Sequence, residues 1–405
     1  MDKKPLWTIF LLVFLDLVGL GIVIPVLPLI LLQPEFSFLS QGLQNVLIGL
    51  LVAAYPIAQF FGAPVLGKYS DRHGRKPILL ISIAGTVLGY LLFGLGILKA
   101  NLLLLFLGRL LDGFTGGNIS VALSSISDIS KGQEKTKHFG MVGMAFGLGF
   151  ILGPFIGGKL ADPSVLPWFT HATPFWFAAI LSALNLLFIL FAFKETLKER
   201  YHKKITFFDG FHDIKKAFGM AELRVIFIVF FLMSFGWSFF TQFFPLYLYK
   251  RFSFSPSDIG NLFGVIGLTI AFTQGGVVRF LASRVRPAAV LRVVLLAAPV
   301  LLILLTFQKS VAGLYLINIL LPLFFGTVFP NITTLISDAV GPESQGEVQG
   351  MRQSLQSLSQ AIPPLIATFA LSLSVSAPIY IGASTLLLSW LTFILFYKHR
   401  KKEQF

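Results

Sequence analysis

Twelve apolar stretches, each long enough to cross a lipid bilayer, occupy most of this chain of 405 residues. A bilayer core about 30 Å thick is crossed by roughly 20 apolar residues in a helix. Only helices and closed barrels satisfy their backbone groups in hydrocarbon, and the alternating segments of about ten residues that are typical of a barrel are absent. The expected fold class is therefore an all-α membrane protein with twelve transmembrane helices.

The expected transmembrane spans follow one another with short connections. They are Trp7–Leu32, Gln44–Leu66, Pro77–Leu98, Leu102–Ile126, Phe139–Ala161, Pro174–Lys194, Leu223–Leu248, Ile259–Leu281, Ala288–Phe307, Val311–Ile336, Gln349–Leu373 and Ala377–Tyr397. An even number of crossings places both ends of the chain on one side of the membrane, and both ends are basic. Most of the 32 Lys and Arg fall on that side, which the positive-inside rule assigns to the cytoplasm.

The net charge of +14 therefore reflects topology and does not indicate a nucleic-acid partner. We expect a multi-pass protein of the cell (inner) membrane with both termini cytoplasmic and the lipid bilayer as its surroundings. The chain has no cysteine, so no disulfide or thiolate metal site is available. No metal and no cofactor are expected.

One long basic loop, Glu195 to Glu222, divides the chain into six helices and six. The expected domains are a bundle over residues 1–194, a cytoplasmic linker over 195–222 and a second bundle over 223–405. The segment Gln274 to Arg286 after the eighth helix weakly repeats the basic segment after the second, which fits two pseudo-symmetric bundles. Within the linker, the spacing of apolar residues over Ile205 to Phe218 predicts an amphipathic helix on the inner membrane face.

The basic segment Gly67 to Pro77 (GKYSDRHGRKP) is too charged for lipid, and we expect it to be a loop between the second and third helices. Its cations can pair with acids at neighbouring helix ends, with Asp128 and the region of Glu347 as candidates. Pairs that join the two bundles would lock one conformation, whereas the alternative is a loop that only sets topology. The candidate gate residues are Gly67, Asp71, Arg72, Gly74, Arg75, Lys76 and Asp128.

Three charged residues stand out inside the expected helices, Asp16 in the first and Arg109 with Asp112 in the fourth. A charge inside the bilayer costs about 3 kcal/mol on insertion scales and marks function or pairing. Arg109 and Asp112, three residues apart, share a helix face. Either they neutralise each other and leave Asp16 as a lone carboxylate, or Arg109 bridges both acids. A carboxylate held in hydrocarbon can take up and release a proton near neutral pH, so these three are the candidates for proton coupling.

A substrate cavity is expected between the two bundles near the middle of the membrane. Its candidate residues are the polar and aromatic side chains on the expected helices, namely Tyr55, Gln59, Asn118, Trp237, Gln242, Asn331, Gln353 and Gln360. A cavity with few charges suits a lipophilic small molecule.

Several motifs together resemble those of one transporter family. The segment GKYSDRHGRKP resembles the signature loop of the major facilitator superfamily. Asp16 to Pro28 (DLVGLGIVIPVLP) and Gly108 to Asn118 (GRLLDGFTGGN) resemble the first- and fourth-helix motifs of its drug:proton antiporters, and the arginine of the latter aligns with Arg109. Gly346 to Ser354 (GEVQGMRQS) is similar to the tetracycline-exporter-like branch.

The fifth helix carries a further match, since Gly149 to Gly158 (GFILGPFIGG) resembles the motif associated with antiporters. Glycines at spacing four favour close helix packing, and a proline permits a kink, as a rocking helix between bundles requires. The residues of this motif are Gly149, Gly153, Pro154, Gly157 and Gly158. One departure is that the expected third and ninth helices lack the acids that tetracycline exporters use there, which weighs against a tetracycline–metal chelate as substrate.

The resemblance implies a secondary active transporter that exports a small lipophilic compound, multidrug or tetracycline-like, in exchange for protons, acting as a monomer by alternating access. Such an activity would confer antibiotic resistance. An alternative on the same fold is transport of a metabolite, siderophore or lipid. An enzyme is not expected, because the chain shows no nucleotide loop, His–Glu metal pair or Ser–His–Asp cluster. A receptor on this fold would be expected to lose the membrane acids or the basic loop.

Overall fold

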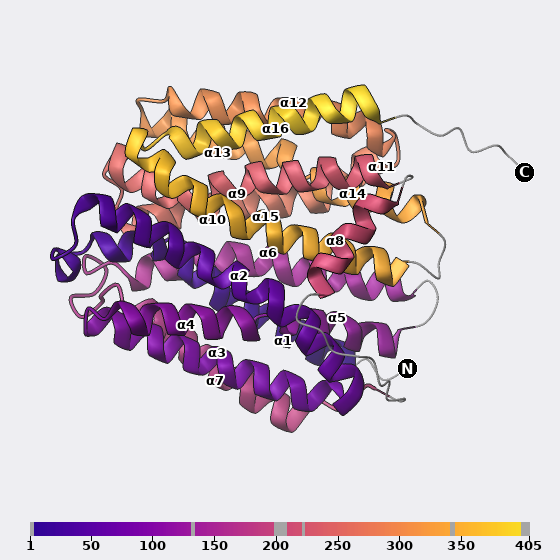
Figure 1. Ribbon diagram of the computed structural model, residues 1–405, viewed down its shortest axis with the longest axis horizontal. Coiled ribbons are helices and arrows are strands. Elements are labelled where there is room, and N and C mark those ends of the chain that lie inside the picture. The colour runs from indigo at the N-terminus through magenta and orange to yellow at the C-terminus, as the bar shows by residue number, and fades with distance from the viewer. Residues whose placement is uncertain (1–3, 131–133, 198–208, 221–222, 341–344, 398–405) are drawn as a thin grey trace, which may run out of the picture.

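The computed structural model describes residues 4–130, 134–197, 209–220, 223–340 and 345–397. Every regular element in these ranges is a helix, and the long helices run side by side (Figure 1). The start of α1 (Lys4–Val23) and the end of α16 (Ala377–Phe396) lie at the same end of the bundle. We name this the terminal end and the opposite one the distal end.

The first six crossings make up the N-terminal half. Its elements are α1 with η1 (Leu27–Leu32) and η2 (Pro34–Phe36), α2 (Gln41–His73), α3 (Arg75–Leu98), α4 (Leu102–Thr115), α5 (Asn118–Ile129), α6 (Glu134–Leu160) and α7 (Thr173–Ala192). The fourth crossing consists of α4 and α5, which are separated at Gly116 and Gly117.

The last six crossings make up the C-terminal half. Its elements are α9 (Arg224–Phe252), α10 (Pro256–Phe272), the π-helical turn η3 (Thr273–Val277), α11 (Val278–Ala282), α12 (Pro287–Thr306), α13 (Val311–Phe325), α14 (Val328–Asp338), α15 (Gln345–Leu373) and α16. The pair α13 and α14 breaks at Gly326 and Thr327, as the fourth crossing of the first half breaks at its glycine pair. The two halves thus share a local irregularity as well as a helix count.

Ten of the crossings in the described part of the chain are long and apolar enough to span a membrane by length and composition. The remaining two are α6, which is rich in glycine, and α15, whose first half is polar. The expected twelve helices are confirmed in number and order. Large apolar side chains on the outside of the bundle, such as Phe191 at 82% exposed and Phe369 at 74%, are where lipid contact is expected.

The halves meet along two pairs of helices, α6 with α10 and α2 with α15. Near the distal end a glycine in each pair allows the helices to approach closely. A Cβ at Gly158 would overlap the Pro256 carbonyl and lie 2.7 Å from Cα of Gly260, and one at Gly49 would overlap Thr368. The distal ends of the halves are therefore in direct contact in this conformation.

A short helix of the linker, α8 (Asp209–Gly219), confirms part of the amphipathic segment, while residues 205–208 lie outside the described ranges. It packs against α15, α9 and α2. The Phe211 ring lies 4.9 Å from that of Phe60 on α2, edge to face. Part of its apolar face is thus covered by the bundle and not only by the expected membrane surface.

Candidate functional site

A buried ion pair lies within α4 of the N-terminal half. Nη1 of Arg109 is 3.4 Å from Oδ2 of Asp112, and the two residues are 6% and 2% exposed. The guanidinium also lies 4.8 Å from the centre of the Tyr55 ring, a cation–π distance. Both groups offset part of the cost of burying the cation.

Asp16 on α1 is half-buried and makes no ion pair with a described Lys or Arg. The Asn118 side chain approaches its carboxyl group, but neither amide atom finds a hydrogen-bond partner in the described part of the chain. Nε of Arg109 is also buried and unpartnered there. Of the two arrangements left open by the sequence, this conformation shows Arg109 paired with Asp112, and it does not show Arg109 bridging both acids.

The cavity candidates of the first half gather around these charges. Nε2 of Gln59 donates to the carbonyl of Gly116 at 3.1 Å and to the hydroxyl of Tyr55 at 3.4 Å. Asn118 begins α5 directly after the glycine break. The structure therefore brings Tyr55, Gln59 and Asn118 into one polar cluster with Asp16 and the ion pair.

The candidates of the second half are dispersed. Trp237 stacks on Phe325 with ring centres 3.6 Å apart. Gln242 on α9 donates to the backbone carbonyl of Gln360 on α15 at 3.1 Å, which joins two of the expected residues. Asn331 donates to a carbonyl of its own helix turn, and Gln353 is half-buried.

Sequence reasoning missed a charge in the eleventh helix. Arg352 on α15 is half-buried and its guanidinium lies 5.7 Å from the centre of the Phe230 ring. The signal was available, because the residue falls inside the expected span Gln349–Leu373 and a charge within a span marks function or pairing.

The segment GKYSDRHGRKP is not a loop, which corrects the expectation. Helix α2 continues to His73, Gly74 alone breaks it with φ +109°, and α3 begins at Arg75. The physical reason is that a helix of 33 residues is about 50 Å long at 1.5 Å per residue, so it extends beyond the hydrocarbon into water and can carry charges there.

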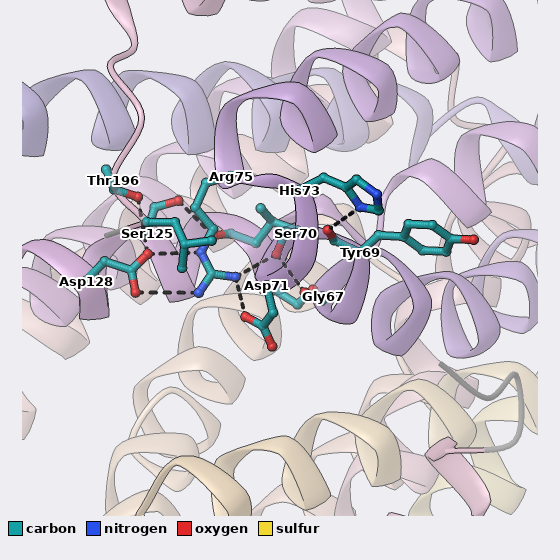
Figure 2. Close-up of polar contacts among 12 residues, drawn as sticks. Gly67, Tyr69, Ser70, Asp71, His73, Arg75, Ser125, Asp128 and Thr196 are labelled. Carbon is teal, nitrogen blue, oxygen red and sulfur yellow. Dashed lines mark hydrogen bonds and ion pairs between the residues drawn. The ribbon is translucent and has the colours of Figure 1, made fainter. Parts of the chain in front are cut away.

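Arg75 is the centre of this motif (Figure 2). Its Nη1 donates to Oδ1 of Asp71 at 2.7 Å and to Oγ of Ser70 at 2.6 Å, and its Nε donates to Oδ2 of Asp128 at 2.9 Å. The expected pairing with Asp128 is confirmed. These bonds join α2, α3 and α5 within the first half, whereas the side chain of Glu347 lies outside what the structure describes.

A carboxylate that sequence reasoning missed caps the start of α3. Glu195, just after α7, accepts hydrogen bonds at 2.9–3.1 Å from the backbone N–H groups of Arg75, Lys76, Thr196 and Leu197. Burial acts to raise the pKa of Glu195, but these bonds outweigh it and hold the pKa below its ordinary value. The capping carboxylate stays ionised near neutral pH.

The remaining motif residues have separate surroundings. Nζ of Lys76 donates to the carbonyl of Leu190 at 2.8 Å, which ties α3 to the end of α7. Arg72 is exposed, and Gly67 faces Ser120 of α5 at an ordinary contact distance.

Gly74→Ala is expected to lower the free energy of unfolding by about 2 kcal/mol, because a positive φ of this kind is open to glycine alone. The added Cβ would also lie 2.5 Å from Oε2 of Glu195. Denaturant titration in detergent measures the loss. Gly42→Ala is the matched control, since that glycine is exposed with nothing within 4 Å, and it should cost nothing. Equal stability of the two variants would contradict the assignment.

The glycines of α6 serve two different faces. Three of them face α1 of the same half, where a Cβ would meet backbone or side-chain atoms of that helix: Gly149, Gly153 and Gly157. Gly158 faces α10 of the other half. Helix α6 thus lies between the bundles, as expected, with Gly158 on its face toward α10 and the other three on its face toward α1. Helix α6 continues through Pro154 without interruption.

Polar contacts close the distal end beside Gly158. Nζ of Lys159 donates to Oγ of Ser257 at 2.6 Å, and Oδ2 of Asp162 accepts from the backbone N–H of Ser257 at 3.2 Å. Oδ1 of Asp162 accepts from the N–H of Ser164 at 3.0 Å. Burial acts to raise the pKa of Asp162, yet the hydrogen bonds outweigh it and lower the pKa.

The distal contact should therefore resist mild acid. A pKa lowered in the closed state gives a stabilisation that is complete above the ordinary aspartate value of about 3.9 and is lost as the pH falls through the lowered value. We expect closure to be constant from about pH 5 to 8, and Asp162→Asn to weaken it at pH 7. Spin labels on Gly42→Cys and Leu373→Cys, at the distal ends of α2 and α15 in a chain without native cysteine, measure the distance. An unchanged distance distribution in Asp162→Asn would contradict this.

Comparison with known proteins identifies the family. Residues 9–364 match the model of the Major Facilitator Superfamily. The class E tetracycline resistance protein of Escherichia coli is 34% identical over 364 residues, which are 89% of this chain and 86% of that protein. The quinolone resistance protein NorA of Staphylococcus aureus is 29% identical over 414 residues, which are 99% of this chain and 98% of that protein.

Solved structures agree on the fold. The human organic anion transporter MFSD10 (TETRAN) superimposes with a TM-score of 0.73 at 24% identity, over 97% of this chain and 99% of that one. A D-xylose-proton symporter superimposes with a TM-score of 0.77 at 16% identity, over 97% and 98%. At these identities the likeness concerns the fold alone. Together with the family model, these findings show that the chain is a multi-pass membrane transporter, not an enzyme, and belongs to the major facilitator superfamily.

Proposed function

We propose that this chain exports small lipophilic compounds in exchange for protons, with both termini in the cytoplasm. The observation that carries the proposal is the half-buried carboxylate of Asp16, which has no ion-pair partner in the described residues and lies beside an ion pair that is already neutral. A carboxylate in such a place can alternate between its charged and neutral forms at modest cost. Relatives named for tetracycline and quinolone resistance support efflux as the direction.

Alternating access supplies the mechanism. The two bundles rock about the polar cluster, and the halves separate at the distal end when the α6–α10 and α2–α15 contacts open. Protonation of Asp16 removes its charge. The charged carboxylate favours hydrated surroundings, whereas the neutral carboxyl group tolerates apolar ones. The Arg75 network keeps the terminal ends of α2, α3 and α5 together as one body while the halves move.

The test is transport by the purified chain in liposomes loaded with a pH gradient, with ethidium as the lipophilic probe. Imposing the gradient should drive ethidium against its concentration difference, and dissipating it with a protonophore should stop the movement. If ethidium moves only down its own concentration difference and at a rate independent of the pH gradient, transport is not coupled to protons. Failure of a wide panel of lipophilic compounds to move would instead favour a metabolite, siderophore or lipid as cargo.

A further inference from the structure

A cavity of about 460 Å³ lies at the distal end of the C-terminal half, where α9 and α12 end and α16 begins. Its lining residues come from these helix ends and the connection before α16: Lys250, Arg251, Thr306, Val375, Ser376 and Tyr380. Helix α16 packs against both α9 and α12, so the cavity belongs to this half by itself. It does not lie on the α6–α10 or α2–α15 contacts between the halves.

The charge of this cavity is entirely positive. Lys250 and Arg251 are adjacent in sequence, no carboxylate lines the cavity, and neither cation forms an ion pair with an acid of the described ranges. Lys250 is also half-buried. A partly desolvated cation without a counter-charge is costly, and binding an anion relieves that cost.

The polar groups around the cations suit a phosphate. The hydroxyls of Ser376 and Tyr380 are hydrogen-bond donors in the lining, whereas that of Thr306 already donates to the carbonyl of Ile303 at 2.7 Å. The Arg251 guanidinium can match two phosphate oxygens at once.

The position of the cavity points to lipid. Phe307, which follows Thr306, is 68% exposed, and Leu373, two residues before Val375, is 84% exposed. Such side chains are expected to contact acyl chains, and Tyr380, 42% exposed, has the character of the aromatic residues found at membrane surfaces. The cations thus lie next to exposed apolar side chains, as is expected of a site where hydrocarbon meets headgroups.

We propose that this cavity binds the phosphate of an anionic phospholipid headgroup, with the acyl chains against the exposed apolar side chains of Phe307 and Leu373. The lipid is a bound structural ligand of the second half. The inference requires only that the chain spans a membrane, so it stands apart from the proposed transport activity.

The test uses the full chain in detergent and titrates phosphatidylglycerol, with phosphatidylethanolamine as the zwitterionic comparison, while native mass spectrometry counts bound lipid. Each cation near a lipid surface contributes about fivefold in affinity, so Lys250→Gln with Arg251→Gln should weaken phosphatidylglycerol binding by about 25-fold. The matched control is Lys99→Gln with Lys309→Gln, which removes two exposed distal cations outside the cavity and should leave this binding unchanged. Each single variant of the cavity should lose about fivefold, which keeps the test valid if the double variant misfolds.

Equal phosphatidylglycerol affinity for the wild-type chain and the cavity variants would overturn the proposal. So would equal weakening by the control pair, because the effect would then be one of total charge. Inorganic phosphate is the second arm. If phosphate alone raises the melting temperature as much as phosphatidylglycerol does, the site binds a free anion and the lipid assignment is wrong.

Discussion

Asp16→Asn should reduce gradient-driven ethidium efflux to the level seen in liposomes without the protein. Asparagine has nearly the same shape as aspartate but cannot bind and release a proton, so the step that couples the two movements is lost. Binding of ethidium should remain, because the Arg109–Asp112 pair and the polar side chains around it are unchanged. The measurement is the initial efflux rate under an imposed gradient, together with the dissociation constant of ethidium from fluorescence.

Two controls separate coupling from general damage. Glu35→Gln removes an exposed acid away from the cluster and should leave efflux at the wild-type rate. Asp112→Asn should act differently from Asp16→Asn, because it leaves the buried Arg109 without its ion-pair partner and lowers stability as well. Concentrative, gradient-dependent efflux by Asp16→Asn would show that Asp16 is not the proton carrier.

Arg75→Gln should lower the free energy of unfolding by about 3 kcal/mol, the effect of removing one partner from a buried charged network. Arg75 is 5% exposed and holds two carboxylates, Asp71 and Asp128, which repel each other without it. The expected result is a lower denaturant midpoint in detergent. Arg72→Gln, at an exposed position of the same motif, should change stability by less than about 0.5 kcal/mol.

A double-mutant cycle makes this prediction specific. If the cost of Arg75→Gln arises from the repulsion between Asp71 and Asp128, then adding Asp128→Asn should restore part of the loss, and the two changes should be far from additive. Arg75→Lys should fall between the wild type and Arg75→Gln, because an ammonium group cannot reproduce the forked geometry. Additive effects of Arg75→Gln and Asp128→Asn would mean that the pair is not the source of the stability.

The number and order of the helices follow from the sequence, because a helix that crosses the bilayer needs a long apolar segment. A run of some 20 apolar residues has few alternatives in a membrane, so errors at helix ends do not change the count. The ends themselves are poorly predicted. Charges at 67–73 indicated a loop, yet nothing in water prevents a helix from carrying them, and the chain turns only where Gly74 permits it.

The candidate site was predictable only in part, for an equally physical reason. Asp128 was a sound expectation for Arg75, since a charged residue near a helix end calls for a partner of opposite sign. Glu195 was not, because it lies 120 residues from Arg75 along the chain and binds backbone N–H groups, which every residue except proline possesses. The pairing of Arg109 with Asp112 and not with Asp16 depends on distances between side chains, which the residue types alone do not give.

The contact of Gly158 with Gly260 has a consequence for kinetics. Further along α6, the side chains of Phe155 and Ile151 lie against Gly264 and Gly267 of α10. At these three points α10 presents no side chain, so the side chains of the two helices do not interlock there. Such a junction can be tight at equilibrium and still open with a low activation barrier. The rate of transport would then depend less on the equilibrium stability of this contact than on the small rearrangement needed to open it.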